Sequence, residues 1–528
     1  MCEFSKTFRK NCIAITLLFV LIFCAPNVGA AKILAVFPVP SISHQVVFRP
    51  LTQELVLRGH ELTVITPNPA FAKGQAPQNL IEIDVQNISY AVKNAVIKEV
   101  SENSNNLLKQ LMLLSQLFLK VFEAQLQNKE FQRILHLDEN YFDLLLIEAC
   151  ATGTLGLSHV FKAPVIQVSS LGALMSNYQA LGIPMHPFLY PASMRTRVYN
   201  LTIAEKMSEI LGIAFSMYMA DSTENAYNQL LRKNFGDDVP NISILTNNID
   251  MLLLNTNPTW SGSYPVPPNV IFIGGIHQNK LKELPKDLKS YLDSSKTGVI
   301  YVSFGSNVKM DMFSPKIIET FVTVFSELPY DILWKWDQDE PPGLPENVKI
   351  SKWFPQADLL HHPKMKLFIT QGGLQSTDEA ITAGVPLIGF PILVDQAYNA
   401  EKYVHFNIGM KLDINKLTKE QLRNSIVTVI SNENYRRNIV KLRALINDQP
   451  QPPLERAVWW TEYVLRNGGA RHLRSPAANI SWFEYLEIKF LIILLSVILT
   501  ILIILITFVK LILRFFRMLF TRKKLKIN

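Results

Sequence analysis

The residues with the clearest chemical potential lie between Phe368 and Gln396, in the stretch FITQGGLQSTDEAITAGVPLIGFPILVDQ. The apolar run 366–370 predicts a buried strand, and Gly372-Gly373 allow the backbone to approach a ligand closely. The segment 376–383 predicts a helix, and the free N–H groups and dipole of a helix start favour phosphate. The stretch therefore predicts a site that holds a diphosphate through backbone donors, without a metal ion.

Acidic and amide side chains accompany this predicted phosphate site. Glu379 and Asp395 can accept hydrogen bonds from vicinal hydroxyls, and the Gln396 amide can both donate and accept. These groups suit a hydroxyl-rich ligand such as a sugar. Ser376 to Glu379 also has the S-x-x-E form of a capping box, so an alternative function for Glu379 is to fix the helix start.

The whole stretch resembles the donor-binding signature of the UDP-glycosyltransferase family, which reads F-[IV]-T-[HQ]-G-G, E-A, G-[VI]-P, P and D-Q. The match has no gap, and many residue types recur at fixed spacing. Most vertebrate members have His where this chain has Gln371, and Gln371 can donate a hydrogen bond but never as a cation. The T-Q-G-G-L-Q-S form is similar to the arthropod branch, which implies glucose as the sugar.

Two further motifs extend the resemblance into the segment before Phe368. The W-F-P-Q motif at 353–356 matches the family's W-x-P-Q, whose indole stacks on uracil, and an S-x-G-S turn begins at Ser303. The resemblance thus assigns UDP-sugar contacts to Ser303, Gly305, Ser306, Trp353, Gln356, Thr370, Gln371, Gly373, Gln375, Ser376, Glu379, Asp395 and Gln396.

Two patterns nearby favour a structural function over ligand binding. Trp334 and Trp336 share one face of a predicted strand and are expected in the core. Asp337-Gln338-Asp339 has a D-x-D form but lies in a polar, proline-flanked loop, which predicts a solvated turn. No metal and no resident cofactor are therefore expected.

A catalytic base is predicted in the first half of the chain. His44 follows the apolar strand predicted over 32–38, in a loop before a helix predicted over 47–57, and a neutral imidazole can take a proton near pH 7. The resemblance implies that His44 is the base and that Glu148, after the strand 142–147, replaces the aspartate that orients it. It also implies in-line displacement of UDP with inversion at the anomeric carbon.

Both ends of the chain have features of membrane targeting. Residues 1–30 have a basic start, an apolar run and a small-residue cleavage site, which predict a signal peptide. Residues 490–509 carry no charge and are long enough to span a bilayer, although a buried core helix is the alternative. Aromatic residues precede this run, and seven Lys or Arg with no acid occupy 510–528, which predicts a type I orientation. Lys524 and Lys526 resemble a dilysine retrieval signal of the endoplasmic reticulum, or an ordinary stop-transfer flank.

Charge, sequons and cysteines agree with a luminal body. The formal net charge of +8 is concentrated at the two termini, so the body is near neutral and nucleic-acid binding is not indicated. Cys150 alone would remain after loss of the signal peptide, which excludes an intrachain disulfide. N-glycosylation sequons occur at Asn87, Asn200, Asn241 and Asn479.

Strands alternate with helices in both halves, which predicts α/β domains with parallel sheets. With the resemblance, this implies a GT-B fold, in which two Rossmann-like domains face a cleft, plus one C-terminal transmembrane helix. The expected segments are a signal peptide (1–30), an acceptor-binding domain (31–270), a UDP-sugar-binding domain (271–448), C-terminal helices that pack back on the first domain with a juxtamembrane segment (449–489), a transmembrane helix (490–509) and a cytoplasmic tail (510–528). A Pro- and Gly-rich linker is expected within 255–289, and 182–197 is a candidate wall of the acceptor pocket or a packing segment.

These expectations define an inverting UDP-glycosyltransferase that moves a hexose, glucose first, to a hydroxyl of a small lipophilic acceptor in detoxification. The alternatives are a glucuronosyl or other sugar donor, a protein or lipid glycan acceptor, or a membrane-anchored UDP-sugar binder without turnover. A binder needs no base, so His44 favours an enzyme. The sequence leaves the acceptor and homo-oligomerisation open.

Overall fold

The computed structural model describes residues 29–102, 112–114, 116–191, 195, 197–306, 308 and 312–524. They form two compact units, which divide between Ser475 and Pro476. The predicted signal peptide lies almost wholly outside the described residues, as does the end of the basic tail after Lys524.

Within the described residues of the first unit, the first sheet has seven parallel strands in the order β3-β2-β1-β4-β5-β6-β7. Its strands are β1 (Lys32–Val36), β2 (Glu61–Thr66), β3 (Leu80–Asp84), β4 (Leu144–Glu148), β5 (Val165–Ser169), β6 (Ile249–Leu254) and β7 (Val270–Phe272). The accompanying helices are α2 (Ile42–Leu57), α3 (Gln86–Glu102), α5 (Leu117–Gln125), α6 (Lys129–Leu135), α7 (Leu157–Val160), α8 (Met175–Leu181), α9 (Ile203–Phe235), α10 (Ile242–Leu245) and α11 (Pro258–Ser261).

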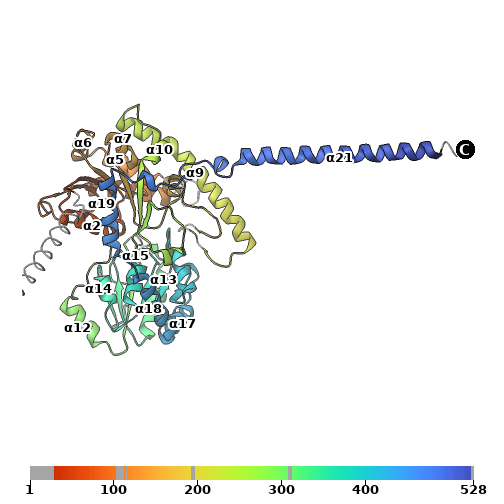
Figure 1. Cartoon of the computed structure of the whole chain (residues 1–528). Helices are drawn as coiled ribbons and strands as arrows, with labels where there is room; N and C mark the ends of the chain where they lie inside the picture. Colours follow the sequence, from red (N-terminus) through yellow and green to blue (C-terminus); the bar gives the residue numbers. More distant parts are fainter. Residues whose placement is uncertain are drawn as a thin grey trace, which may run out of the picture. The chain divides into compact units, whose positions relative to one another are not determined.

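The second sheet has six parallel strands among the described residues, in the order β10-β9-β8-β11-β12-β13. They are β8 (Val299–Ser303), β9 (Asp331–Lys335), β10 (Val348–Ser351), β11 (Met365–Thr370), β12 (Leu387–Gly389) and β13 (Gly409–Lys411). Its helices, grouped in the lower part of Figure 1, are α12 (Lys286–Ser294), α13 (Pro315–Glu327), α14 (Gln356–Leu360), α15 (Leu374–Ala383), α16 (Gln396–His405), α17 (Lys419–Ser431) and α18 (Glu433–Asn447).

Helices cover both faces of each sheet, because alternate strand residues point to opposite sides and both sides are apolar. On β1, Leu34 packs with Phe122 of α5 in one core, and Ile33 packs with Phe48 of α2 in the other. On β8, Val302 and Tyr301 divide in the same way between two cores. Parallel strands covered on both faces confirm the predicted α/β class.

Helix α19 (Pro453–Asn467) follows α18 of the second sheet but packs on the first sheet, beside α2. Val458 is fully buried in the same core as Phe48, and Arg58, the residue that caps the C-terminus of α2, pairs with Glu455 at 2.8 Å. The C-terminal part of this unit therefore crosses back and ties the two sheets together.

Two local predictions differ from the structure, and one long helix was not predicted. Helix α2 begins at Ile42, so His44 lies in its first turn rather than in a loop; the polar start of the helix lacks the apolar spacing that marks its later turns. The expected linker within 255–289 contributes strand β7 to the first sheet, because a short apolar run follows its prolines. Helix α9, which both figures show as one long rod, was not predicted, although Thr202 and Glu205 form its capping box.

The second unit contains α20 (Trp482–Tyr485) and α21 (Ile488–Lys524). Among the described residues, α21 is the one helix that is long and apolar enough to cross a membrane, over Ile488–Leu519. This is consistent with a membrane anchor and includes the predicted span 490–509.

Candidate functional site

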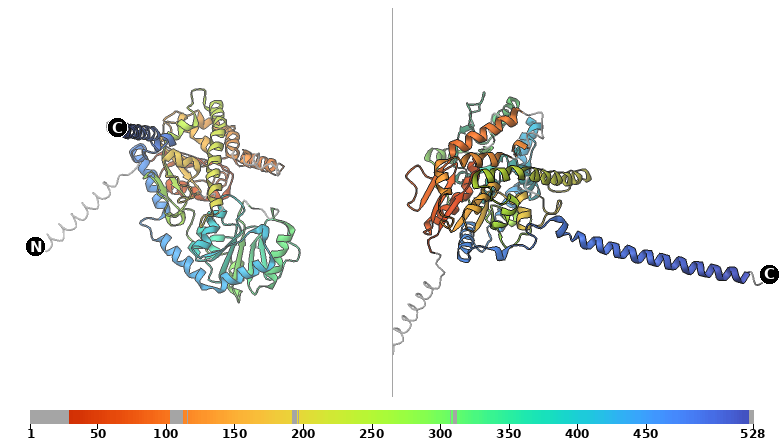
Figure 2. Two further views of the ribbon diagram at one scale, coloured as in Figure 1. Left: turned by 90° about the vertical axis from the view of Figure 1, so that its right-hand side faces the viewer. Right: turned by 90° about the horizontal axis from the view of Figure 1, so that it is seen from above.

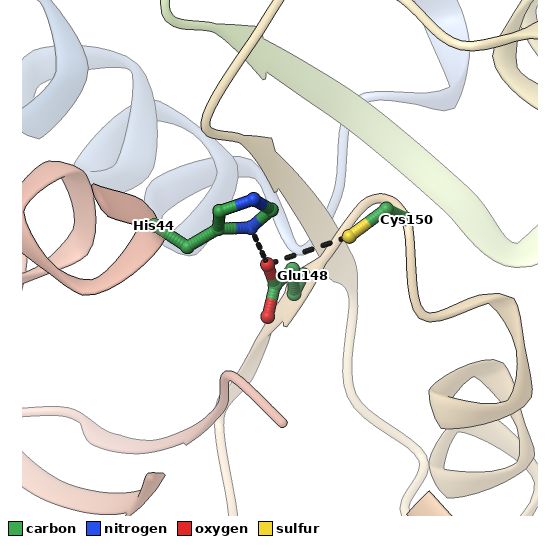
Figure 3. A group of neighbouring side chains, drawn as sticks. All are labelled: His44, Glu148 and Cys150. Carbon is green, nitrogen blue, oxygen red and sulfur yellow. Dashed lines mark hydrogen bonds and ion pairs between the residues drawn. The ribbon is translucent and has the colours of Figure 1, made fainter. Parts of the chain in front are cut away.

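A short polar contact in the first half of the chain joins His44 to Glu148. His44 lies in the first turn of α2, and Glu148 is the last residue of β4, which is the neighbour of β1. The distance between His44 Nδ1 and Glu148 Oε1 is 2.5 Å, and the Glu148 side chain is fully buried (Figure 3). The carboxylate's other oxygen, Oε2, accepts the Val39 N–H at 3.1 Å.

This geometry determines how the imidazole can act. A carboxylate only accepts hydrogen bonds, so a neutral His44 that bonds to it carries its proton on Nδ1. The lone pair then lies on Nε2, which is free to accept a proton from an acceptor hydroxyl. The longer side chain of Glu148 therefore reaches the imidazole, as its predicted role of orienting His44 requires.

Cys150 is the third member of this group and had no predicted role at the site. Its Sγ lies 3.4 Å from the same Glu148 Oε1, and the thiol donates to the carboxylate (Figure 3). Burial, together with the negative charge of Glu148, raises the pKa of the Cys150 thiol well above its usual value. The sequence contained a signal for this residue, because Glu148-Ala-Cys150 places two polar groups directly after a buried strand, where site residues are expected.

The predicted phosphate-binding turns lie together at the carboxyl ends of β8 and β11. Ser303 and Thr370 are register partners at the last position of the two strands. A Cβ on Gly305, which has φ +77°, would lie 2.2 Å from Gln371 Nε2, so a side chain at this position would strain the backbone and displace the glutamine amide. Thr370 Oγ1 donates to Gln371 Oε1 at 3.0 Å, which holds the glutamine over the Gly305 turn.

Gln356, Ser376 and Glu379 form a second part of the predicted donor site. Gln356 Nε2 donates to Ser376 Oγ at 2.9 Å and to Glu379 Oε2 at 2.7 Å. Helix α15 has Gly373 at its N-cap, which means that Ser376 lies inside the first turn. The capping-box alternative for Glu379 is therefore wrong, because the helix starts earlier than its apolar spacing indicated.

Burial raises the pKa of Glu379 to about 7, against a smaller lowering effect of the Gln356 hydrogen bond. Burial also raises the pKa of its neighbour Asp378 to about 8, with an added contribution from Glu379. Asp378 was not predicted as a site residue, and its buried Oδ2 has no hydrogen-bond partner in the described part of the chain. Two adjacent carboxyl groups thus titrate near neutral pH on this helix.

Asp395 and Gln396 lie at the start of α16, next to the Gly372 turn. Asn399 Nδ2 donates to Asp395 Oδ2 at 2.8 Å and to the Gly372 carbonyl at 2.9 Å. Gln396 Oε1 accepts the N–H groups of its own loop, from Ile392 and Leu393, so only its amide nitrogen is available to a ligand.

Burial raises the pKa of Asp395 to about 6, while the nearby His44 acts to lower it. This electrostatic interaction joins two residues from opposite halves of the sequence. The predicted sugar-binding carboxylate therefore lies close to the predicted base.

Lys335 is a donor-site candidate that the sequence analysis missed. It is the last residue of β9, and its Nζ donates to the Gly305 carbonyl at 2.5 Å and lies 5.3 Å from the ring centre of Trp353. Trp353 is itself 65% exposed, as a platform for a flat base requires. The position of Lys335 could have identified it, because it is a lysine at the carboxyl end of a parallel strand and ligands of open α/β sheets bind at that edge.

Direct hydrogen bonds connect the two sheets around this site. Gln375 Nε2 donates to the Ser170 carbonyl just after β5, at 3.0 Å, and Trp260 Nε1 donates to Asn399 Oδ1 at 3.1 Å. A mostly apolar cavity lies beside these contacts and includes Asp395, Tyr178 and Tyr398 in its wall. Ile183 and Pro191, from the segment considered for the acceptor pocket, also line it, whereas residues 192–194 and 196 are outside the described residues.

The structure also places the other residues that the sequence singled out. Asp337 to Asp339 are exposed in the loop after β9, and Trp334 and Trp336 are buried, which confirms the core reading of the two tryptophans. Among the sequon asparagines, Asn87, Asn200 and Asn241 are exposed and Asn479 is half-buried.

Residues 31–525 match the model of the family described as UDP-glucoronosyl and UDP-glucosyl transferase. The chain belongs to this family. It is 36% identical over 483 residues to an ecdysteroid UDP-glucosyltransferase of Spodoptera littoralis nuclear polyhedrosis virus, a match that covers 87% of this chain and 93% of the viral protein. It is 32% identical over 479 residues to UDP-glucosyltransferase 2 of Dactylopius coccus, with coverage of 88% and 90%.

Solved structures support the fold of this UDP-glycosyltransferase. The glycotransferase of kitacinnamycin matches with a TM-score of 0.58 and 21% identity, and covers 83% of this chain and 99% of its own. The calicheamicin glycosyltransferase CalG4 matches with a TM-score of 0.53 and 17% identity over the same shares. Both are GT-B glycosyltransferases, so the predicted GT-B fold is confirmed.

For this UDP-glycosyltransferase, Glu379→Gln is expected to raise the KM for the UDP-sugar donor about 10- to 100-fold, because hydrogen bonds to a charged acceptor contribute about 1.5–3 kcal/mol. Below pH 7 the protonated Glu379 predominates, so the wild-type KM should fall as pH rises through about 7. The variant should lack this transition and keep only the pH dependence that comes from Asp395 near pH 6 and Asp378 near pH 8. Steady-state kinetics at several pH values measures both effects.

The matched control is Glu346→Gln, which neutralises an exposed carboxylate in the same half of the chain. Its donor KM should equal that of the wild type at each pH. A Glu379→Gln enzyme with a wild-type KM and the wild-type pH dependence would show that Glu379 does not contact the donor.

Proposed function

We propose that this protein transfers glucose from UDP-glucose to a hydroxyl of a small lipophilic acceptor, with His44 as the base. The observation that carries the proposal is the 2.5 Å contact between His44 Nδ1 and the buried Glu148 carboxylate, with Asp395 close enough to interact electrostatically with His44. Donor recognition and proton removal then occur at one place.

In this mechanism the second sheet holds UDP-sugar and the first sheet activates the acceptor. Ser303, Gly305, Ser306, Thr370, Gln371, Gly373 and Ser376 bind the diphosphate, Trp353 and Gln356 bind the nucleoside, and Gln375, Glu379, Asp395 and Gln396 bind or position the sugar. The start of α15 and the Lys335 ammonium stabilise the negative charge that develops on UDP. His44 Nε2 removes the acceptor proton as the hydroxyl oxygen attacks the anomeric carbon, and UDP departs from the opposite side, which inverts that carbon.

Glucose is proposed as the sugar because relatives over most of the chain carry the name UDP-glucosyltransferase. The neutral Gln371, which replaces the histidine of most vertebrate members, agrees with a donor that has no carboxylate of its own. No metal enters the mechanism, since backbone N–H groups and Lys335 supply the positive charge that the diphosphate requires.

For the acceptor, the cavity beside Asp395 supports a lipophilic molecule with a hydroxyl group. Tyr178 and Tyr398 present large rings with polar ends to it, and Leu171 and Phe272 add apolar surface. Several viral relatives are named for ecdysteroids, so a polyhydroxylated steroid belongs among the candidate acceptors beside simple phenols.

We further propose that the body lies in the lumen of the endoplasmic reticulum. The predicted signal peptide, the apolar helix α21 and the basic residues that follow the predicted span support a type I anchor, and the terminal lysines support retrieval. Three exposed sequon asparagines are accessible for glycosylation there. This placement suits conjugation of membrane-soluble compounds in detoxification.

The donor and acceptor assignment is tested with membranes that carry the full chain. They are incubated with UDP-glucose, UDP-glucuronate, UDP-galactose or UDP-N-acetylglucosamine and a mixture of lipophilic phenols and ecdysteroids, and the conjugates are identified by mass. We expect hexosides from UDP-glucose at a rate at least about tenfold above those from the other donors. Faster conjugation from UDP-glucuronate would refute glucose, and donor binding without any conjugate would indicate a binder without turnover.

The base assignment is tested with His44→Ala. A general base contributes about 10²- to 10⁴-fold to the rate, so kcat should fall by that factor while the donor dissociation constant changes less than about threefold. His159→Ala, which removes an imidazole 3.6 Å from Asp238 and away from the site, should keep wild-type kcat. Turnover of His44→Ala within about twofold of the wild type would contradict the assignment.

Glu148 acts through His44 and is a positioning residue. Glu148→Ala should lower kcat at least about 100-fold with little change in donor KM, and Glu148→Asp should recover part of that loss, because the shorter arm keeps the charge but lengthens the contact. A purely structural role would instead change donor KM, kcat and the thermal midpoint together, and would give no recovery with aspartate.

A further inference from the structure

Three side chains that are strong metal ligands meet at the end of β4. Among the described residues, His44, Glu148 and Cys150 are the group of three whose ligand atoms all lie within 4.8 Å of one another (Figure 3). The residues come from the start of α2, from the last position of β4 and from the loop that follows it. Each contributes a different ligand atom, which are an imidazole nitrogen, a carboxylate oxygen and a thiol sulfur.

We propose that His44, Glu148 and Cys150 form a binding site for a thiophilic divalent cation, Zn²⁺ or Cd²⁺, and that its occupancy stops glycosyl transfer. The cation is an inhibitor here and not a cofactor of the reaction. The binding site stands on geometry alone, whereas its inhibitory effect rests on the proposed function of His44 as the base.

The distances fit a tetrahedral ion after a small movement. Zinc bonds of about 2.0–2.3 Å to nitrogen, oxygen and sulfur place the ligand atoms about 3.3–3.6 Å apart. The distance between Cys150 Sγ and Glu148 Oε1 is already 3.4 Å. The 2.5 Å contact between His44 Nδ1 and Glu148 Oε1 must lengthen by about 1 Å, which requires a rotation of the imidazole, whose side chain is 16% exposed. The third pair, Cys150 Sγ and the histidine nitrogen, lies within 4.8 Å and must shorten to a similar distance.

The surroundings support a metal ligand set. The Val39 N–H bond to Glu148 Oε2 fixes the carboxylate in the way that outer hydrogen bonds fix ligands in metal sites. Glu148 is also fully buried, which strengthens its attraction to a cation. Three protein ligands leave a fourth position for water.

The ligand types select the class of cation. Imidazole and thiolate favour zinc and cadmium, whereas magnesium and calcium require oxygen ligands in larger number. Magnesium added to a glycosyltransferase assay should therefore leave this site empty, and the response to zinc or cadmium should be distinct.

The proton balance explains why binding blocks the base. The cation displaces the Cys150 thiol proton to solvent and bonds to the thiolate, and it takes the place of the proton on His44 Nδ1. A neutral imidazole bonded to metal through Nδ1 carries its one proton on Nε2. The displaced Nδ1 proton thus reappears on Nε2 by exchange with solvent, and Nε2 has no lone pair with which to accept the acceptor proton.

Binding is measured on the purified full chain in detergent, with cadmium as the probe. We expect one cadmium per chain and a near-ultraviolet charge-transfer band from thiolate to metal. Cys150→Ser should lose the band and weaken cadmium binding at least about tenfold, and His159→Ala, which alters an unrelated histidine–aspartate pair, should match the wild type. A wild-type protein that shows no band at saturating cadmium would overturn the site.

Inhibition is measured separately, and each variant is compared with its own metal-free rate. Zinc should reduce wild-type transfer at least about tenfold, EDTA should restore it, and magnesium should not reduce it. Cys150→Ser should need at least about tenfold more zinc for half-inhibition. Equal zinc sensitivity of Cys150→Ser and wild type, or cadmium binding with full activity, would overturn the inhibitory effect. If no donor supports transfer, the proposed function fails, while the cadmium band still decides whether the site exists.

Discussion

The hydrogen bond between His44 and Glu148 is the contact on which the rest of the site depends. It requires β1 and β4 to be adjacent, α2 to begin at Ile42, and a fully buried carboxylate whose second oxygen is held by the Val39 N–H. The parallel sheet meets the first condition, because it brings the carboxyl ends of strands far apart in sequence to one edge. The loop between β1 and α2 meets the other two, since it starts the helix at Ile42 and directs the Val39 N–H at the carboxylate. Burial of the carboxylate then makes a paired imidazole strongly favoured over an unpaired one.

The second sheet follows the same rule at its own carboxyl edge. Lys335 joins the Trp353 ring to the Gly305 carbonyl, and Gln371 lies over the Gly305 turn. Asn399 then joins the Gly372 carbonyl to Asp395, which interacts with His44. Gln375 and Trp260 provide hydrogen bonds between the halves, and α19 returns to the first sheet. The donor turns and the base are thereby held by one connected framework.

The sequence predicted the parts of this framework that depend on local patterns. Apolar runs located β1, β4 and β11 to within two residues at each end. The ungapped signature grouped Gln371, Glu379 and Asp395 in one predicted donor site. The sequence alone could not assign Lys335, Cys150 or Asp378 to the site. A single polar residue belongs to no periodic pattern, so its function becomes visible only when the strand order and the burial of its side chain are known. The first turn of α2 and the start of α15 were missed for a related reason, since helix starts are polar and lack apolar spacing.

The proposed reaction depends on Glu148 holding His44 with its proton on Nδ1 and its lone pair on Nε2. Nuclear magnetic resonance of the protein labelled with ¹⁵N at histidine tests this directly at a pH where His44 is neutral, with the His44→Ala spectrum subtracted to assign the signal. We expect a protonated Nδ1 and an unprotonated Nε2, and Glu148→Ala should abolish this preference. A neutral His44 with its proton on Nε2 in the wild-type protein would rule out His44 as the base, because such an imidazole cannot remove the acceptor proton.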